Sequence, residues 1–347
     1  MLKHSRVAVE LGFRGNGLCW GTRRPDRERR EAARGLPIVT GVFQKTLQHA
    51  VECTGVGIHS GAPARMAIKP ARPGAGIVFK RTDVKGRMGM IPARFDLVSE
   101  TRLGTTLVNG SGIKVAVIEH LMAALAGMNI DNAVVEVNGP ELPIMDGSAA
   151  PFAELIEAAG VKSQLAPRRA IRVLKRATVR DGQKQAEFVP GRTFMVEVDI
   201  DFESRAIRRQ RFSFDVFGVG FAEEVAAART FGFRQDVESL KANGFARCGS
   251  LDNSVVVDGE RVLNDGGLRY SDEFARHKLL DAIGDLYLAG APIVGHFRGL
   301  RSGHTLNNAL LRALFADATA YEIVALGAEA RTPQPAAQMP IGGVAIA

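Results

Sequence analysis

The sequence predicts an α+β protein, because alternating strand-like runs and helix-periodic runs occupy separate stretches in each half of the chain. The first half has strand-like runs at 51–58, 65–69, 76–80, 105–108 and 133–137, and helices near 118–126 and 151–159. The second half has strands at 171–180, 184–190, 193–201 and 212–214, and helices near 221–228, 272–289 and 304–315. A length of 347 residues suits two domains, and 46% hydrophobic with 24% charged residues is ordinary globular composition.

The predicted helix near 272–289 carries the most informative polar residues of the chain. His277, Asp281 and Asp285 are four residues apart, so they lie on one face of the helix. An imidazole and a carboxylate at this spacing can hold one divalent cation. When this helix is considered alone, a surface His–Asp pair with a second Asp nearby explains it slightly better than a ligand pair does.

The predicted helix near 118–126 supplies a second pair, in which Glu119 adjoins His120 before an apolar run that ends at Gly127. Catalytic zinc commonly keeps three protein ligands and one open position for water, while a carboxylate that is not a ligand takes a proton from that water. His120 fits the third ligand and Glu119 fits the base. The alternative for Glu119 is a carboxylate that only stabilises the helix start.

A third fragment places His304 after a Ser-Gly turn, at the start of another amphipathic helix. A helix start disfavours a protonated imidazole, so a proton-donating His304 needs a carboxylate beside it. Asp285 is the candidate for that carboxylate. The alternative for His304 is a helix-capping residue.

Together these fragments resemble the zinc-dependent deacetylase family of lipid A biosynthesis, UDP-3-O-acyl-N-acetylglucosamine deacetylase. The resemblance runs from about residue 44 to about residue 324, and its order of motifs is more specific than any one motif. The further matching segments are 54–61, 130–137, 143–152, 228–233 and 262–269. The resemblance implies two related domains, 44–164 and 171–325, joined by a linker at 165–170. Each domain is expected to be a sheet layered against helices, with the active site in the cleft between the domains.

The resemblance also implies a role for each matching residue. The reaction it implies is zinc-dependent hydrolysis that removes acetate from UDP-3-O-(3-hydroxyacyl)-N-acetylglucosamine. The implied Zn²⁺ ligands are His120, His277 and Asp281. The implied catalytic residues are Glu119 as general base, His304 as proton donor to the amine, Asp285 as its charge partner, and Thr230 as a stabiliser of the oxyanion. Lys278 corresponds to a lysine near the sugar and diphosphate.

The resemblance further implies substrate contacts. An insert at about 231–262 corresponds to a passage for the fatty acyl chain, lined by Phe231, Phe233, Leu251 and Val255. Asp236 corresponds to an acidic residue near the nucleotide, His59 to a histidine at the mouth of the site, and Leu103 to the rim of the sugar pocket. The plainer alternative for the insert is an ordinary βαβ excursion with core residues.

The net charge of +8 raises the alternative of a basic nucleic-acid-binding protein with a structural metal. Residues 1–43 hold nine Lys and Arg against four Asp and Glu, so they carry +5 of this charge. The remainder shows three ligands rather than the four of a closed structural site, so we expect no nucleic-acid partner. A zinc hydrolase that acts on another amide is the nearer alternative.

The two ends of the chain lie outside the resemblance. We expect residues 1–43 to be either disordered or the result of a mis-called start, with Val39 or Val42 as the true initiator, because no Met separates Met1 from Met66. We expect residues 326–347 to form a disordered tail.

Cysteine usage and hydropathy bear on the compartment. Cys19, Cys53 and Cys248 are too few and too scattered for a disulfide framework, which indicates a reducing compartment. No uninterrupted apolar stretch is long enough to span a bilayer. We therefore expect a cytoplasmic enzyme, and we expect it to be a monomer.

Overall fold

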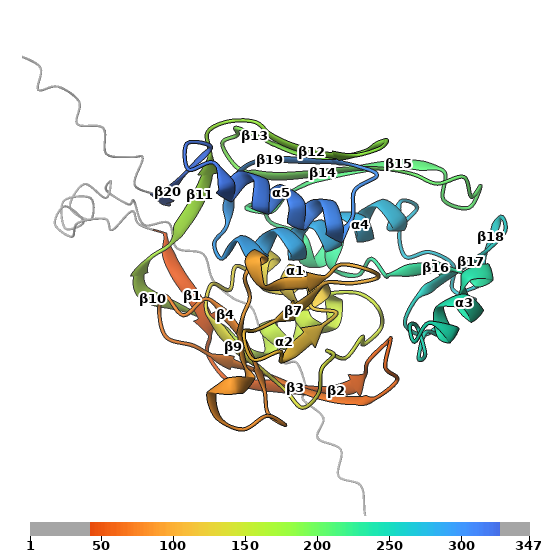
Figure 1. Ribbon diagram of the computed structural model, residues 1–347, viewed down its shortest axis with the longest axis horizontal. Helices are drawn as coiled ribbons and strands as arrows, with labels where there is room; N and C mark the ends of the chain where they lie inside the picture. Colours follow the sequence, from red (N-terminus) through yellow and green to blue (C-terminus); the bar gives the residue numbers. More distant parts are fainter. Residues whose placement is uncertain (1–41, 327–347) are drawn as a thin grey trace, which may run out of the picture. The chain divides into compact units, whose positions relative to one another are not determined.

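A computed structural model describes residues 42–326 and confirms the α+β class, with two large sheets and helices between them (Figure 1). The described residues all belong to one compact unit. The division into domains at 165–170 stays a prediction.

The first sheet is built from the first half of the described chain, in the strand order β2-β3-β9-β4-β5. Its strands are β2 (Val51–Val56), β3 (Pro63–Pro70), β4 (Ile77–Arg81), β5 (Met90–Pro92) and β9 (Ala133–Val137). Alternate residues of β3, β4 and β9 are buried, as expected for a sheet with one covered face. Helices α1 (Glu119–Gly127) and α2 (Ala150–Ala159) lie over the covered face (Figure 1).

The second sheet is built from the second half, with the path β12-β13-β19-β11-β20 and with β14 joining β15 to β19. Its strands are β11 (Arg169–Val173), β12 (Ala177–Asp181), β13 (Lys184–Val189), β14 (Phe194–Asp201), β15 (Arg209–Asp215), β19 (Ile293–Leu300) and β20 (Tyr321–Ala325). Helices α4 (Glu273–Leu286) and α5 (His304–Ala316) lie between this sheet and α1 (Figure 1).

Smaller elements complete the fold. Strand β1 (Phe43–Leu47) pairs with β10 (Val161–Pro167), and β6 (Val98–Glu100), β7 (Thr106–Val108) and β8 (Lys114–Ala116) form a small sheet. An insert combines β16 (Phe231–Phe233), β17 (Val255–Asp258) and β18 (Arg261–Val262) with α3 (Val237–Ala242). The short helical turns are η1 (Gly86–Gly89), η2 (Phe95–Leu97), η3 (Ala222–Ala226), η4 (Arg234–Asp236) and η5 (Tyr287–Ala289).

Helix α4 is the centre of the packing, because all but two of its fourteen residues are buried. It crosses α1 at Gly284, where a Cβ atom would lie 2.0 Å from the carbonyl oxygen of Glu119 and 3.1 Å from the amide nitrogen of Ala123. Only a residue without a side chain permits this approach of two helix backbones. The glycine therefore sets how closely α1 and α4 bring their polar residues together.

Several sequence predictions need correction. The expected strand at 171–180 is two strands, because β11 pairs with β19 and β20 whereas β12 pairs with β13 at the opposite edge of the sheet. The expected helix at 221–228 is only the π-helical turn η3, and the amide of Arg229 bonds to the carboxylate of Glu273 instead of continuing a helix.

Central strand β19 was not predicted at all, because Gly295, Gly299 and Arg298 interrupt its apolar pattern. The expectations about residues 1–41 and 327–347 lie outside the described part of the chain. Within residues 42–326, no helix combines the length and the apolar character that crossing a membrane requires.

The close crossing of α1 and α4 predicts that Gly284→Ala destabilises the protein. The added methyl group must push the two helices apart, so the free energy of unfolding should fall by about 1–3 kcal/mol. Chemical denaturation measures this change. The matched control is Gly110→Ala, because a Cβ at Gly110 meets no atom within 4 Å. Equal stability of the two variants would contradict the account of the helix crossing.

Candidate metal centre and catalytic site

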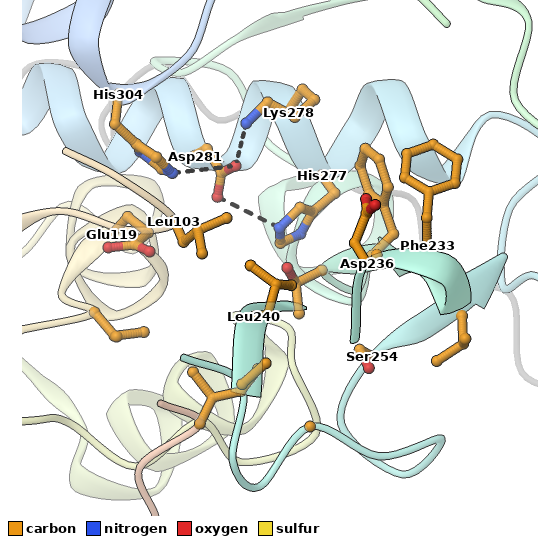
Figure 2. A pocket seen from close by; sticks show the side chains of 18 of the residues that line it. Leu103, Glu119, Phe233, Asp236, Leu240, Ser254, His277, Lys278, Asp281 and His304 are labelled. Atoms are coloured by element: carbon orange, nitrogen blue, oxygen red, sulfur yellow. Dashed lines mark hydrogen bonds and ion pairs between the residues drawn. The ribbon is translucent and has the colours of Figure 1, made fainter. Parts of the chain in front are cut away.

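A cavity of about 850 Å³ lies where α1, α4 and the start of α5 meet the insert. Its walls include Glu119 and His120 from α1, His277 and Asp281 from α4, and His304 from α5. Figure 2 shows Glu119, Asp281 and His304 on one side of the cavity and Phe233 of the insert on the other, with His277 between them.

Three side chains in this cavity form a cluster with the composition of a metal site. One ligand atom each from His120, His277 and Asp281 lies within 4.8 Å of the other two, and all three residues are buried. The Oδ1 atom of Asp281 is 3.4 Å from Nε2 of His277 and 3.7 Å from Nε2 of His120. The cluster joins two helices that are about 150 residues apart in the sequence.

The chemistry of the cluster fits a divalent cation. Asp281 Oδ1 is buried and has no hydrogen-bond partner among the residues that the structure describes, although an unsatisfied buried acceptor is costly. His277 Nδ1 donates to the carbonyl oxygen of Ala228 at 3.0 Å, which leaves the lone pair of Nε2 facing Asp281. Burial, reinforced by the neighbouring His277, lowers the pKa of His120 to about 3, so its imidazole is neutral and able to bind a metal.

Glu119 lies beside the cluster at the start of α1. Val117, two residues earlier, has a φ of 58°, a conformation that is strained for a β-branched residue. The carboxylate of Glu119 is buried and accepts a hydrogen bond from the amide of Thr105 at 2.9 Å. Burial raises the pKa of Glu119 to about 7, which is near the best value for a general base at neutral pH.

His304, which is partly buried, pairs with the buried Asp285 next to Glu119. His304 Nδ1 donates to Asp285 Oδ2 at 2.8 Å, and its Nε2 lies 4.0 Å from Asp281 Oδ2. Burial alone would lower the pKa of His304, but the carboxylates of Asp285, Asp281 and Glu119 outweigh it and raise the pKa to about 9. His304 is therefore an imidazolium at neutral pH, as a proton donor requires.

Lys278 approaches the same cluster from the next position on α4. Its Nζ atom donates to Asp281 Oδ2 at 2.7 Å (Figure 2). Burial would lower the pKa of Lys278, but Asp281 raises it above the ordinary value, so the ammonium stays charged. Each oxygen of Asp281 thus faces a different group: Oδ2 faces Lys278, and Oδ1 faces the two imidazoles.

The other predicted site residues also line the cavity, namely Thr230, Phe231, Asp236, Leu103 and His59. His59 has both ring nitrogens occupied: Nε2 donates to the carbonyl oxygen of Leu103 at 2.9 Å, and Nδ1 accepts from the amide of Ala246 at 3.2 Å. His59 therefore connects the rim of the cavity to the insert through these two hydrogen bonds.

The apolar part of the cavity differs in part from the expectation. Phe231 and Phe233 line it, but Leu251 does not and is 46% exposed. Val255 is fully buried behind the wall, and its neighbour Val256 lines the cavity instead, because successive strand residues point to opposite faces.

Sequence reasoning missed two buried partners of Asp285. Thr105 Oγ1 donates to Asp285 Oδ1 at 2.6 Å, and Asn307 Nδ2 donates to Asp285 Oδ2 at 2.9 Å. Asn307 lies three residues after His304 on α5, so helical spacing offered a signal for it. Thr105 lies in a short strand-like run with no pattern that marks it.

Comparison with known proteins identifies the family. A family model described as LpxC: UDP-3-O-acyl N-acetylglycosamine deacetylase matches residues 44–316. The chain belongs to this family. A UDP-3-O-acyl-N-acetylglucosamine deacetylase from Shewanella frigidimarina is 49% identical over 294 residues, which cover 84% of this chain and 96% of the relative. One from Myxococcus xanthus is 52% identical over 281 residues, which cover 81% of this chain and 89% of the relative.

Membership of this deacetylase family confirms the resemblance that the sequence motifs predicted. The chain is accordingly a deacetylase, a hydrolase that cleaves an amide bond. Its matched region contains every residue of the metal cluster, together with Glu119 and His304.

Proposed function

We propose that this enzyme removes acetate from UDP-3-O-(3-hydroxyacyl)-N-acetylglucosamine and produces UDP-3-O-(3-hydroxyacyl)-glucosamine, a step of lipid A biosynthesis. Both relatives are named for this substrate, which supports its assignment. The observation that carries the proposal in this chain is the buried His120–His277–Asp281 cluster with Glu119 and His304 beside it.

The metal in this proposal is Zn²⁺, held by His120, His277 and Asp281. Two imidazoles and one carboxylate are the ligand set of many catalytic zinc sites. When bound, Zn²⁺ supplies Lewis-acid chemistry that lowers the pKa of water and polarises a carbonyl oxygen. Neutral imidazoles and a carboxylate oxygen without a protein partner support this assignment.

Proton transfer in this proposal belongs to Glu119 and His304. Glu119 accepts a proton from the attacking water, for which its pKa of about 7 is suited. His304 donates a proton to the departing amine, because an amide anion is a very poor leaving group. Asp285 keeps His304 charged through its hydrogen bond, and Thr230 stabilises the oxyanion from the cavity wall.

The remainder of the cavity suits the rest of the substrate. Phe231, Phe233 and Val256 offer an apolar surface for the acyl chain, in the insert at about 231–262. Lys278, Asp236, His59 and Leu103 lie around the polar end and contact the sugar and nucleotide in this proposal. We also propose that the enzyme is a cytoplasmic monomer whose site lies between domains 44–164 and 171–325.

Acetate release tests the proposed function directly. Purified zinc-loaded protein should release acetate from UDP-3-O-acyl-N-acetylglucosamine, and Glu119→Ala and His304→Ala should each lower kcat by roughly a hundredfold or more. The controls are Glu154→Ala and His49→Ala, whose side chains are exposed and outside the cavity. If the folded, zinc-loaded wild type did not hydrolyse this substrate, the proposed substrate would be wrong. A zinc hydrolase that acts on another amide would then be favoured.

The pKa values of the two acid–base groups predict the pH dependence of kcat. Activity should rise with pH as Glu119 loses its proton near 7 and should fall as His304 loses its proton near 9. Asp285→Asn removes the anion that raises the pKa of His304. The alkaline limb of the pH profile of this variant should therefore move to lower pH. The exposed control Asp181→Asn should keep both limbs. An unchanged alkaline limb in Asp285→Asn would contradict the role of this carboxylate.

A further inference from the structure

Thr105 contacts both halves of the proposed acid–base apparatus. It is 2% exposed and lies directly before β7. Its backbone amide donates to Glu119 Oε2 at 2.9 Å, and its hydroxyl donates to Asp285 Oδ1 at 2.6 Å. Its carbonyl oxygen accepts from the amide of Ile118 at 3.4 Å. Every polar group of this one residue is therefore directed at the start of α1 or at α4.

The two carboxylates that Thr105 contacts have different tasks and come from different helices. Glu119 from α1 is the proposed base, and Asp285 from α4 is the charge partner of His304. The amide nitrogen and the hydroxyl oxygen of one threonine are separated by a few covalent bonds with a fixed geometry. One residue thus fixes where the base and the partner of the acid lie relative to each other.

The hydrogen bonds also orient each carboxylate. Among the described residues, Thr105 is the hydrogen-bond donor to Glu119, and it holds Oε2, so the cavity-lining carboxylate keeps one oxygen for a substrate water. Asp285 receives the threonine hydroxyl on Oδ1 and receives His304 and Asn307 on Oδ2. With Oδ1 held, Oδ2 cannot rotate away from the ring of His304.

The segment that carries Thr105 is itself tied to α5, the helix that begins with His304. The hydroxyls of Thr101 and Thr305 lie 2.8 Å apart, and the ring of Phe95 stacks on Phe315 with centroids 4.6 Å apart. The guanidinium of Arg312 donates to the carbonyl oxygens of this segment at residues 95, 96 and 98. The position of Thr105 is therefore set by the same helix that positions His304.

We infer that Thr105 is a positioning residue for proton transfer, which holds Glu119 and the His304–Asp285 pair in a fixed mutual geometry. This inference rests on the proposed function. It differs from a purely structural role, in which the threonine would only satisfy buried polar groups and support the fold. Within residues 42–326, Thr105 makes no hydrogen bond to a ligand of the proposed metal, so its substitution should leave metal affinity unchanged.

Substitution of the hydroxyl separates these roles. Thr105→Val keeps the shape and the backbone amide but removes the donor to Asp285, and Thr105→Ala removes the same donor without any risk of overpacking. Both should lower kcat about tenfold or more with little change in KM, since small displacements of reacting groups cost rate rather than affinity. Thr105→Ser restores the donor and should restore kcat. Thr106→Val, a neighbour whose hydroxyl is outside the cavity, is the matched control.

A spectroscopic measurement tests the geometry independently of turnover. The proton on Nδ1 of His304 is shared with a carboxylate, so it should give a low-field proton resonance in the zinc-loaded protein, assigned by its loss in His304→Ala. The resonance should shift or broaden in Thr105→Val and Thr105→Ala and return in Thr105→Ser. This readout applies even if the wild type fails to hydrolyse the proposed substrate, which would count against the proposed function alone.

Wild-type kcat and an unchanged His304 resonance in Thr105→Val and Thr105→Ala would overturn the inference. It would also be overturned if both variants lost zinc or thermal stability to the same degree as activity, because that outcome indicates a structural role. A selective loss of kcat at full zinc content, rescued by serine, is the expected result.

Discussion

The close crossing of α1 and α4 at Gly284 is the constraint on which the site depends. The backbone oxygen of Glu119 occupies the space that a side chain at residue 284 would need. This contact lies one residue before Asp285 on α4 and one residue before His120 on α1, so it fixes the metal cluster and the acid–base groups together. Helix α5 then brings His304 to Asp285, and the segment before β7 brings Thr105 to both carboxylates.

The electrostatics of the site follow from burial. Three carboxylates, those of Glu119, Asp281 and Asp285, are buried within one small volume, where each ionised group costs several kcal/mol unless it is compensated. Lys278 compensates Asp281, and His304 compensates Asp285, whereas Glu119 receives only a backbone amide and consequently has a raised pKa. The unsatisfied Asp281 Oδ1 costs about 1–3 kcal/mol. A bound divalent cation would remove that cost.

The sequence predicted which residues form the site better than it predicted how the fold brings them together. Helical spacing in α4 predicted that His277, Asp281 and Asp285 share a face, and the resemblance supplied the partners from α1 and α5. Helical spacing alone could not predict whether that face of α4 is exposed to solvent or buried. The face is buried because α1, which is remote in sequence, packs against it. Strand β19 was not predicted, since its glycines interrupt the apolar pattern and Gly295 is explained only by the close approach of Val173, which is remote in sequence. Thr105 was not predicted for the same reason, because its proposed role depends on two contacts with helices that are remote in sequence.

X-ray absorption spectroscopy of the zinc-loaded protein tests the central claim most directly, that the crossing of α1 and α4 assembles a three-ligand metal site. The account predicts one zinc with two imidazole nitrogens and one or two carboxylate or water oxygens at about 2.0–2.2 Å. His120→Ala should remove one of the imidazoles, and the exposed-site variant His49→Ala should remove none. A sulfur ligand at about 2.3 Å, or a spectrum that His120→Ala leaves unchanged, would contradict the account.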